Sequence, residues 1–151
     1  MSKGPEANLW QLVRKSLPKK CFATRIENKH GGGVPDVHVV WDGISFWVEL
    51  KTAKNNKPKL SPHQIAWNMA YWARGGSNFY LVKALSTKKI YLFTGDKGPD
   101  LHDRGISGTE GQCFEDLASL FEALRLLCRR VSEPCGSAAA DSSPGATGDG
   151  T

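Results

Sequence analysis

Asp36, Glu49 and Lys51 have residue types and a spacing that would let them act together on one face of a β-hairpin. Asp42-Gly43 separates two runs of alternating apolar side chains within residues 34–52, which predicts a hairpin with a two-residue turn. Pairing across this turn places Asp36 directly opposite Glu49. Carboxylates whose Cβ atoms are about 5 Å apart repel each other, so we expect a cation beside them. Carboxylate oxygens favour Mg²⁺ or Mn²⁺.

The chemistry expected of these side chains is hydrolysis of a phosphate ester. Glu49 and Lys51 are two residues apart and project to the same face, and the main-chain carbonyl of Leu50 between them would add an oxygen ligand. A bound divalent metal polarises a phosphodiester and lowers the pKa of its water. Lys51 would position that water or stabilise charge on the phosphoryl oxygens. His38 shares the face, either as a phosphate contact or as a spectator.

The elements around the hairpin supply further candidates. Pro5 to Leu17 is predicted to be a helix with an apolar stripe, on which Glu6 is either a first-turn acid that interacts with the helix dipole or a carboxylate aimed at the site. Residues 21–27 are predicted to form a strand, and its last residue, Glu27, is the alternative additional acid. Glycines at 31–33 are either a flexible connection or a place where a phosphate backbone approaches closely.

Basic residues flank the predicted hairpin on both sides. The loop after it contains four lysines, which form either a solvated surface or a surface that contacts phosphate. The residues predicted to contact DNA are Lys29, His30, Lys54, Lys57 and Lys59. The next helix opens with a capping box of Ser61 and Gln64, so Gln64 is either a cap or part of the site.

The second half of the chain is predicted to complete the fold. Strands are expected over 78–85 and 89–93, an irregular glycine-rich loop over 94–113, and an amphipathic helix over 114–131 that covers the sheet or pairs with another subunit. Trp67 and Tyr71 are expected to belong to the core. Residues 1–131 are expected to form one domain, and residues 132–151, rich in Ser, Ala and Gly, a disordered tail.

Composition narrows the class of function. The chain has 151 residues and a formal net charge of +5, and because residues 132–151 contain three acids and no base, residues 1–131 carry +8. A basic body suits a polyanionic partner such as nucleic acid. No apolar run has the length of a membrane span and no signal-peptide core is present, so we expect a cytoplasmic protein. The cysteines are expected to be reduced, and no His and Cys set has the spacing of a zinc site.

The combined pattern resembles the PD-(D/E)XK nuclease superfamily. The resemblance lies in Gly33-Val34-Pro35-Asp36, in Glu49-Leu50-Lys51, and in Leu60-Ser61 followed by Gln64 and Trp67. The last element and the leading helix look most like the VRR-NUC branch, and archaeal-type Holliday-junction resolvases have a similar order. The resemblance implies an α/β fold with a mixed central β-sheet flanked by helices, the core of restriction endonucleases.

This resemblance also implies roles for individual residues. Asp36 and Glu49 would bind Mg²⁺ or Mn²⁺, Lys51 would be catalytic, and Gln64 would be the glutamine that follows the catalytic strand. Glu6 would be the acid of the first helix. The function expected is a structure-selective DNA endonuclease of the Holliday-junction-resolvase type, a homodimer without an organic cofactor, in a bacterial or phage-infected cell. Alternatives are a nickase, a restriction or repair nuclease subunit, and a non-catalytic DNA-binding module.

Overall fold

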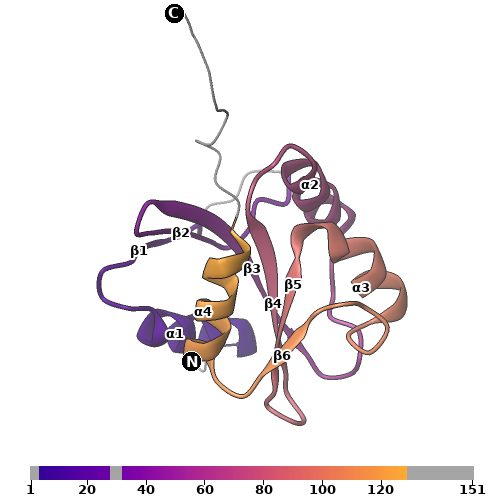
Figure 1. Cartoon of the computed structure of the whole chain (residues 1–151). Coiled ribbons are helices and arrows are strands. Elements are labelled where there is room, and N and C mark those ends of the chain that lie inside the picture. The colour runs from indigo at the N-terminus through magenta and orange to yellow at the C-terminus, as the bar shows by residue number, and fades with distance from the viewer. Residues whose placement is uncertain (1–3, 28–31, 129–151) are drawn as a thin grey trace, which may run out of the picture.

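A mixed six-stranded sheet, whose strands lie side by side in chain order, forms the centre of the molecule (Figure 1). The computed structural model describes residues 4–27 and 32–128. The strands are β1 (Phe22–Arg25), β2 (Val37–Trp41), β3 (Ile44–Ala53), β4 (Asn78–Ala84), β5 (Ile90–Thr94) and β6 (Gln112–Phe114). Neighbours are antiparallel except β3 and β4. That parallel pair requires a crossover connection, and the helix between the two strands provides it.

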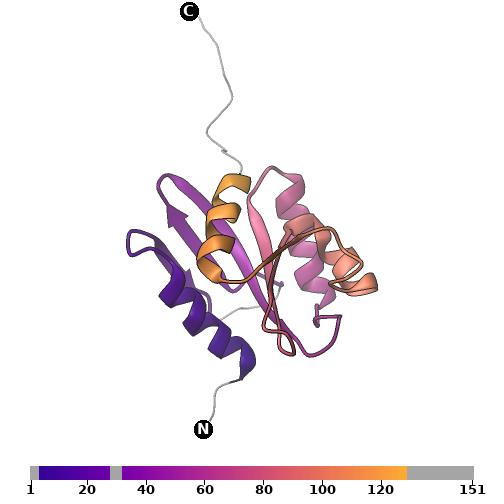
Figure 2. The same ribbon diagram turned by 60° about the horizontal axis from the view of Figure 1, so that its bottom comes forward.

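In the described part of the chain, four α-helices cover the two sides of this sheet (Figure 1 and Figure 2). They are α1 (Pro5–Ser16), α2 (Pro62–Ala73), α3 (Gly98–Arg104) and α4 (Leu117–Leu127), with a 3-10 turn η1 (Gly95–Lys97) before α3. Helices α1 and α4 lie together on one side, and α2 and α3 lie on the other. The α/β fold class expected from the sequence is confirmed.

The β2–β3 hairpin has the predicted register. Val37 pairs with Val48, and Trp41 pairs with Ile44. The turn residues Asp42 and Gly43 have φ angles of 50° and 82°, as a two-residue hairpin turn requires. The ladder ends at Val37, however, so the predicted extra pair of Asp36 with Glu49 does not form.

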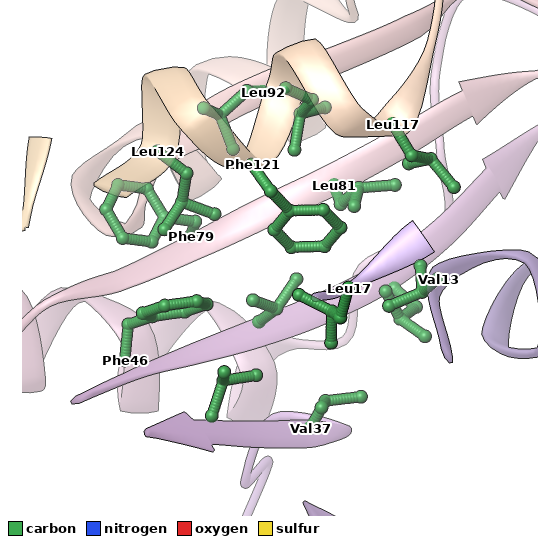
Figure 3. Packing of buried hydrophobic residues seen from close by; sticks show 14 of the residues in the cluster. Val13, Leu17, Val37, Phe46, Phe79, Leu81, Leu92, Leu117, Phe121 and Leu124 are labelled. Carbon is green, nitrogen blue, oxygen red and sulfur yellow. The ribbon is translucent and has the colours of Figure 1, made fainter. Parts of the chain in front are cut away.

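One face of the sheet packs against α1 and α4 to form the larger core. Figure 3 shows Phe46 of β3, Phe79 of β4 and Phe121 of α4 close together in this layer. All three rings are at most 1% exposed. The apolar face predicted for the hairpin is therefore confirmed, and the described part of the last helix covers the sheet, one of the two roles left open for it.

Residues 94–113 differ from the predicted irregular loop, because they contain η1, α3 and most of β6. Pro99 lies in the first turn of α3, where its missing N–H costs nothing. Leu101 is fully buried in the smaller core, on the opposite side of the sheet from α1 and α4, and Gly105 follows the helix with a φ angle of 78°. The prediction missed a short helix that is stabilised mainly by tertiary packing.

The last helix begins later than the predicted residue 114. Phe114 belongs to β6, where it pairs with Ile90 of β5. The carboxylate of Asp116 caps α4 by accepting a hydrogen bond from Ser119 N at 2.8 Å. Residues 129–131 of the predicted helix, the predicted tail over 132–151, and Lys29 and His30 lie outside the described residues. In the described part of the chain, no helix has both the length and the apolar character needed to cross a membrane.

Candidate active site

Strand β3 carries Glu49 and Lys51 on the face opposite the larger core. Glu49 is only 1% exposed, and Lys51 Nζ lies 3.8 Å from its Oε2 atom. Leu50 between them points to the larger core, where it is 3% exposed. The alternation of a strand thus places the charged side chains on one face and the apolar one on the other, as the sequence predicts.

Gln64 contacts the same carboxylate from the first turn of α2. Its Nε2 donates a hydrogen bond to Glu49 Oε2 at 3.0 Å, while its Oε1 accepts one from Ser61 N at 3.0 Å. Ser61 Oγ in turn accepts a hydrogen bond from Gln64 N, which completes the capping box. Gln64 is therefore both the predicted helix cap and a hydrogen-bond partner of Glu49.

Asp36 lies beside the same strand, at its edge rather than on its face. Its Oδ2 accepts a hydrogen bond from Leu50 N at 2.9 Å, so the carboxylate contacts the peptide that joins Glu49 to Leu50. This contact replaces the predicted cross-strand pair with Glu49. The reason is that β2 pairs with β3 only as far as Val48, which leaves the next edge amides of β3 open to side-chain acceptors.

Glu6 occupies the next open position on that edge. Its Oε2 accepts a hydrogen bond from Thr52 N at 3.4 Å, although α1 packs on the larger-core face of the sheet. The amides of Leu50 and Thr52 are two residues apart, about 7 Å along the strand. Glu27 is exposed just beyond β1, one residue after Ile26, whose N–H donates to the main-chain oxygen of Asp36. Both acids are therefore near the strand edge.

Gly33 brings the segment before Asp36 against the start of α2. Its φ angle is +73°, and a Cβ atom there would lie 2.3 Å from the main-chain oxygen of His63. Only glycine fits this combination of backbone conformation and close approach. The two roles predicted for the glycines were a flexible connection and close approach of a phosphate backbone. Gly33 has a different role, because its close backbone contact fixes the segment before Asp36 beside the helix that carries Gln64.

Buried polar side chains hold α2 against β4 behind the site. Asn78 Nδ2 donates to the main-chain oxygen of Asn68 at 2.9 Å, and Asn68 Nδ2 donates to the main-chain oxygen of Gln64 at 2.9 Å. Both asparagines are fully buried. Buried polar groups cost free energy unless they are hydrogen-bonded. These two hydrogen bonds therefore specify one position for the first turn of α2.

Tyr80 of β4 is the neighbour of Glu49 in the parallel register, and it is fully buried. Burial and then the charge of Glu49 raise the pKa of its phenol well above the ordinary value, so this group stays neutral. Tyr80 is not among the site residues predicted from the sequence. The sequence signal that could have identified Tyr80 is its position in β4, because alternate side chains of this strand lie on the same face of the sheet as Glu49.

Two cavities open beside the site, and lysines line both. The first, of about 660 Å³, lies between Lys51, Lys57, Lys59, Gln64 and His102 of α3. The second, of about 430 Å³, adjoins Glu6 and is also lined by Lys54, Lys57 and Lys59. The predicted lysine loop thus lies next to Lys51 and Gln64. His102 was missed because the sequence analysis treated its helix as a loop.

The donor atoms at the site fit a hard divalent cation. Mg²⁺ is bound in proteins through one or two carboxylates and keeps other positions for water and substrate phosphate. Glu49 supplies a buried carboxylate, and the carboxylate of Asp36 accepts a hydrogen bond from the main-chain N–H of the next residue, Leu50. Over residues 4–27 and 32–128, no group of three or more His, Cys, Asp or Glu side chains is placed to hold a metal by itself.

Trp67 and Tyr71 do not belong to the core, contrary to the prediction. Both are partly exposed, and their rings stack with centroids 4.9 Å apart. Trp67 also contacts Trp47 of β3, with ring centroids 5.7 Å apart. The apolar periodicity of α2 predicted a buried stripe, but α2 covers only part of the sheet face, so these rings remain at its border.

The structure is similar to that of Hjc, a Holliday junction resolvase from the archaeal hyperthermophile Archaeoglobus fulgidus. The alignment covers 79% of this chain and 97% of the Hjc chain, with a TM-score of 0.51 and 15% sequence identity. The sequence matches no protein-family model and no curated protein. The chain therefore has the restriction-endonuclease-like fold of Hjc, with a mixed sheet flanked by helices.

Proposed function

We propose that this chain is a metal-dependent endonuclease of the PD-(D/E)XK superfamily that hydrolyses phosphodiester bonds in DNA. The observation that carries the proposal is the convergence on Glu49 Oε2: Lys51 Nζ lies 3.8 Å away and Gln64 Nε2 lies 3.0 Å away. A carboxylate that is 1% exposed and has these neighbours on a nuclease-like fold supports a catalytic role better than a structural one.

Asp36 and Glu49 would hold Mg²⁺ or Mn²⁺, with the carbonyl of Leu50 as a further oxygen donor. The ion, when bound, polarises the phosphodiester and lowers the pKa of a water molecule. Lys51, whose ammonium group lies 3.8 Å from Glu49 Oε2, would orient the attacking water or stabilise charge on the phosphoryl oxygens. Gln64 fixes the rotamer of Glu49.

The lysine loop supports the choice of DNA as the substrate. Lys57 and Lys59 line both cavities beside the site, and Lys54 lines the second one. Ammonium groups that neutralise phosphates release counterions, which makes binding tighter at low salt. Lys29 and His30 are proposed to extend this contact, and Glu6 or Glu27 to act as the additional acid near the metal.

Branched DNA is the proposed substrate, and a homodimer the proposed form. The support is the fold shared with Hjc, whose full length this chain matches almost completely. Resolving a junction requires two symmetric cuts, and a small protein with one site per chain supplies them as a two-fold dimer.

The test is cleavage of labelled four-way junctions, flaps and plain duplexes by the purified protein with Mg²⁺ or Mn²⁺. We expect paired cuts in the junction and slower cleavage of duplex. Equal cleavage rates on duplex and junction would contradict the preference for branched DNA but would still support nuclease activity. If the folded protein binds DNA but cleaves no substrate with either metal, the result would contradict the nuclease and favour a non-catalytic DNA-binding module.

A further inference from the structure

Four aromatic side chains form a continuous row on the sheet face that carries Glu49. His38 of β2 contacts Trp47 with ring centroids 4.6 Å apart, Trp47 contacts Trp67 at 5.7 Å, and Trp67 stacks on Tyr71 at 4.9 Å. All four side chains are partly exposed. The row connects two strands with α2, and its members belong to neither buried core cluster.

The row is adjacent to the proposed active site along both elements that build that site. Trp47 precedes Glu49 by two residues on β3, so both side chains project from the same face. Trp67 follows Gln64 by three residues on α2, which places the two on the same side of the helix. Trp47, Glu49 and Lys51 therefore follow one another along β3, from the aromatic row to the lysine-lined cavity.

The chemistry of this arrangement matches a nucleic-acid strand. A row of aromatic rings that ends at a lysine-lined groove is the combination by which proteins bind single strands, since bases stack on the rings while cations track the phosphates. The rings also carry polar atoms at their edges, in the imidazole of His38 and the hydroxyl of Tyr71.

We propose that the row His38–Trp47–Trp67–Tyr71 is a platform on which an unstacked base of the DNA substrate lies, next to the phosphate at Glu49. This inference rests on the proposed nuclease function and names the substrate feature that the site selects, an unpaired nucleotide beside the cleaved bond. Branch points provide such nucleotides, whereas continuous duplex keeps every base stacked.

The test uses Trp67→Leu, which removes the central ring but keeps an apolar side chain, with Trp67→Phe as its matched control. Binding of the full chain is measured by fluorescence anisotropy in EDTA, on a duplex and on the same duplex with one unpaired nucleotide. We expect Trp67→Leu to weaken binding of the unpaired-base DNA by about tenfold, the loss of one stacked base, and to leave duplex binding unchanged. Trp67→Phe should bind both DNAs like the wild type.

Tyr71→Leu, with Tyr71→Phe as control, provides a second variant pair if Trp67→Leu does not fold. An equal effect of the leucine variants on both DNAs, or no effect, would overturn the platform. A leucine variant that sediments as a smaller species than the wild type, without a change in base selectivity, would also overturn it and assign the row to contact with a second copy.

Cleavage by the wild type in Mg²⁺ is measured in parallel. Selective binding without any cleavage would support the platform and count against the nuclease, so the two failures are distinguishable.

Discussion

The two faces of β3 show how one strand serves both stability and chemistry. Phe46, Val48 and Leu50 point toward α1 and α4 and are 1%, 1% and 3% exposed. Their neighbours Trp47 and Glu49 point to the other face, where the contacts are aromatic stacking and hydrogen bonds. Because apolar burial on one face stabilises the strand, the other face can hold a charged carboxylate.

The polar face is nevertheless specified closely. The hydrogen bonds from Asn78 to Asn68 and from Asn68 to Gln64 place the amide of Gln64 against Glu49. Each of these three side-chain amides donates a hydrogen bond to an acceptor, which fixes the geometry of the network more than it stabilises the fold.

Neighbouring aromatic residues of β3 give the largest expected difference. Phe46→Ala should lower the free energy of unfolding by about 3–5 kcal/mol, because the ring is fully buried among other rings. Trp47→Ala should cost clearly less, because Trp47 is partly exposed. Urea denaturation followed by circular dichroism measures both. A larger loss for Trp47→Ala would contradict the assignment of stability to the α1 and α4 face.

Removal of the lysine charge at the site should affect catalysis more than stability. Lys51→Met keeps the apolar stem and should lower the rate of DNA cleavage by about 10²–10³-fold, the typical effect of one group that stabilises charge in the transition state. Single-turnover cleavage and urea denaturation are measured on the same preparation. A loss of stability that exceeds the loss in activation free energy would show that Lys51 is mainly structural.

The two roles of Gln64 can be separated by its capping partner. Ser61→Ala and Gln64→Ala each remove half of the capping box, so each should lower the free energy of unfolding by about 0.5–2 kcal/mol. Only Gln64→Ala also removes the hydrogen bond to Glu49, so only this variant should cleave DNA more slowly. Equal cleavage rates for the two variants would contradict a role of Gln64 in the active site.

The smallest predicted effect concerns pH. Burial lowers the pKa of His38, so the unfolded chain binds a proton at this residue more readily than the folded chain. Stability should therefore decline as the pH falls through about 6.5, the ordinary histidine value. His38→Phe keeps a ring against Trp47 and should remove part of this decline. Urea midpoints between neutral and mildly acidic pH measure it, and identical slopes in both proteins would contradict it.

The sequence predicts those features that depend on neighbours in the chain. Asp42-Gly43 and the alternation around it predict the hairpin register, and Ser61 with Gln64 predicts the start of α2. The acidic edge was mispredicted because strand pairing was extended by one residue, whereas Asp36 instead accepts a hydrogen bond from the open amide of Leu50. Only the tertiary structure shows where β2 stops.

Features that depend on packing between distant elements were not predictable in the same way. Helix α3 is short, and Leu101 is buried only because α3 packs over the sheet. Trp67 has the spacing of a core residue, but its surroundings depend on how far α2 extends across the sheet. The signals for α3 were nonetheless present in Pro99 near its start and Gly105 at its end.

The most direct test of the account compares Glu49→Gln with Glu122→Gln, an exposed acid on α4, in Mg²⁺-dependent cleavage of a four-way junction. Glu49→Gln preserves the shape of the side chain but removes its charge. We expect Glu49→Gln to fold and to bind the junction without cleaving it, while Glu122→Gln cleaves like the wild type. Cleavage by Glu49→Gln at the wild-type rate would contradict the assignment of this face of the sheet to catalysis.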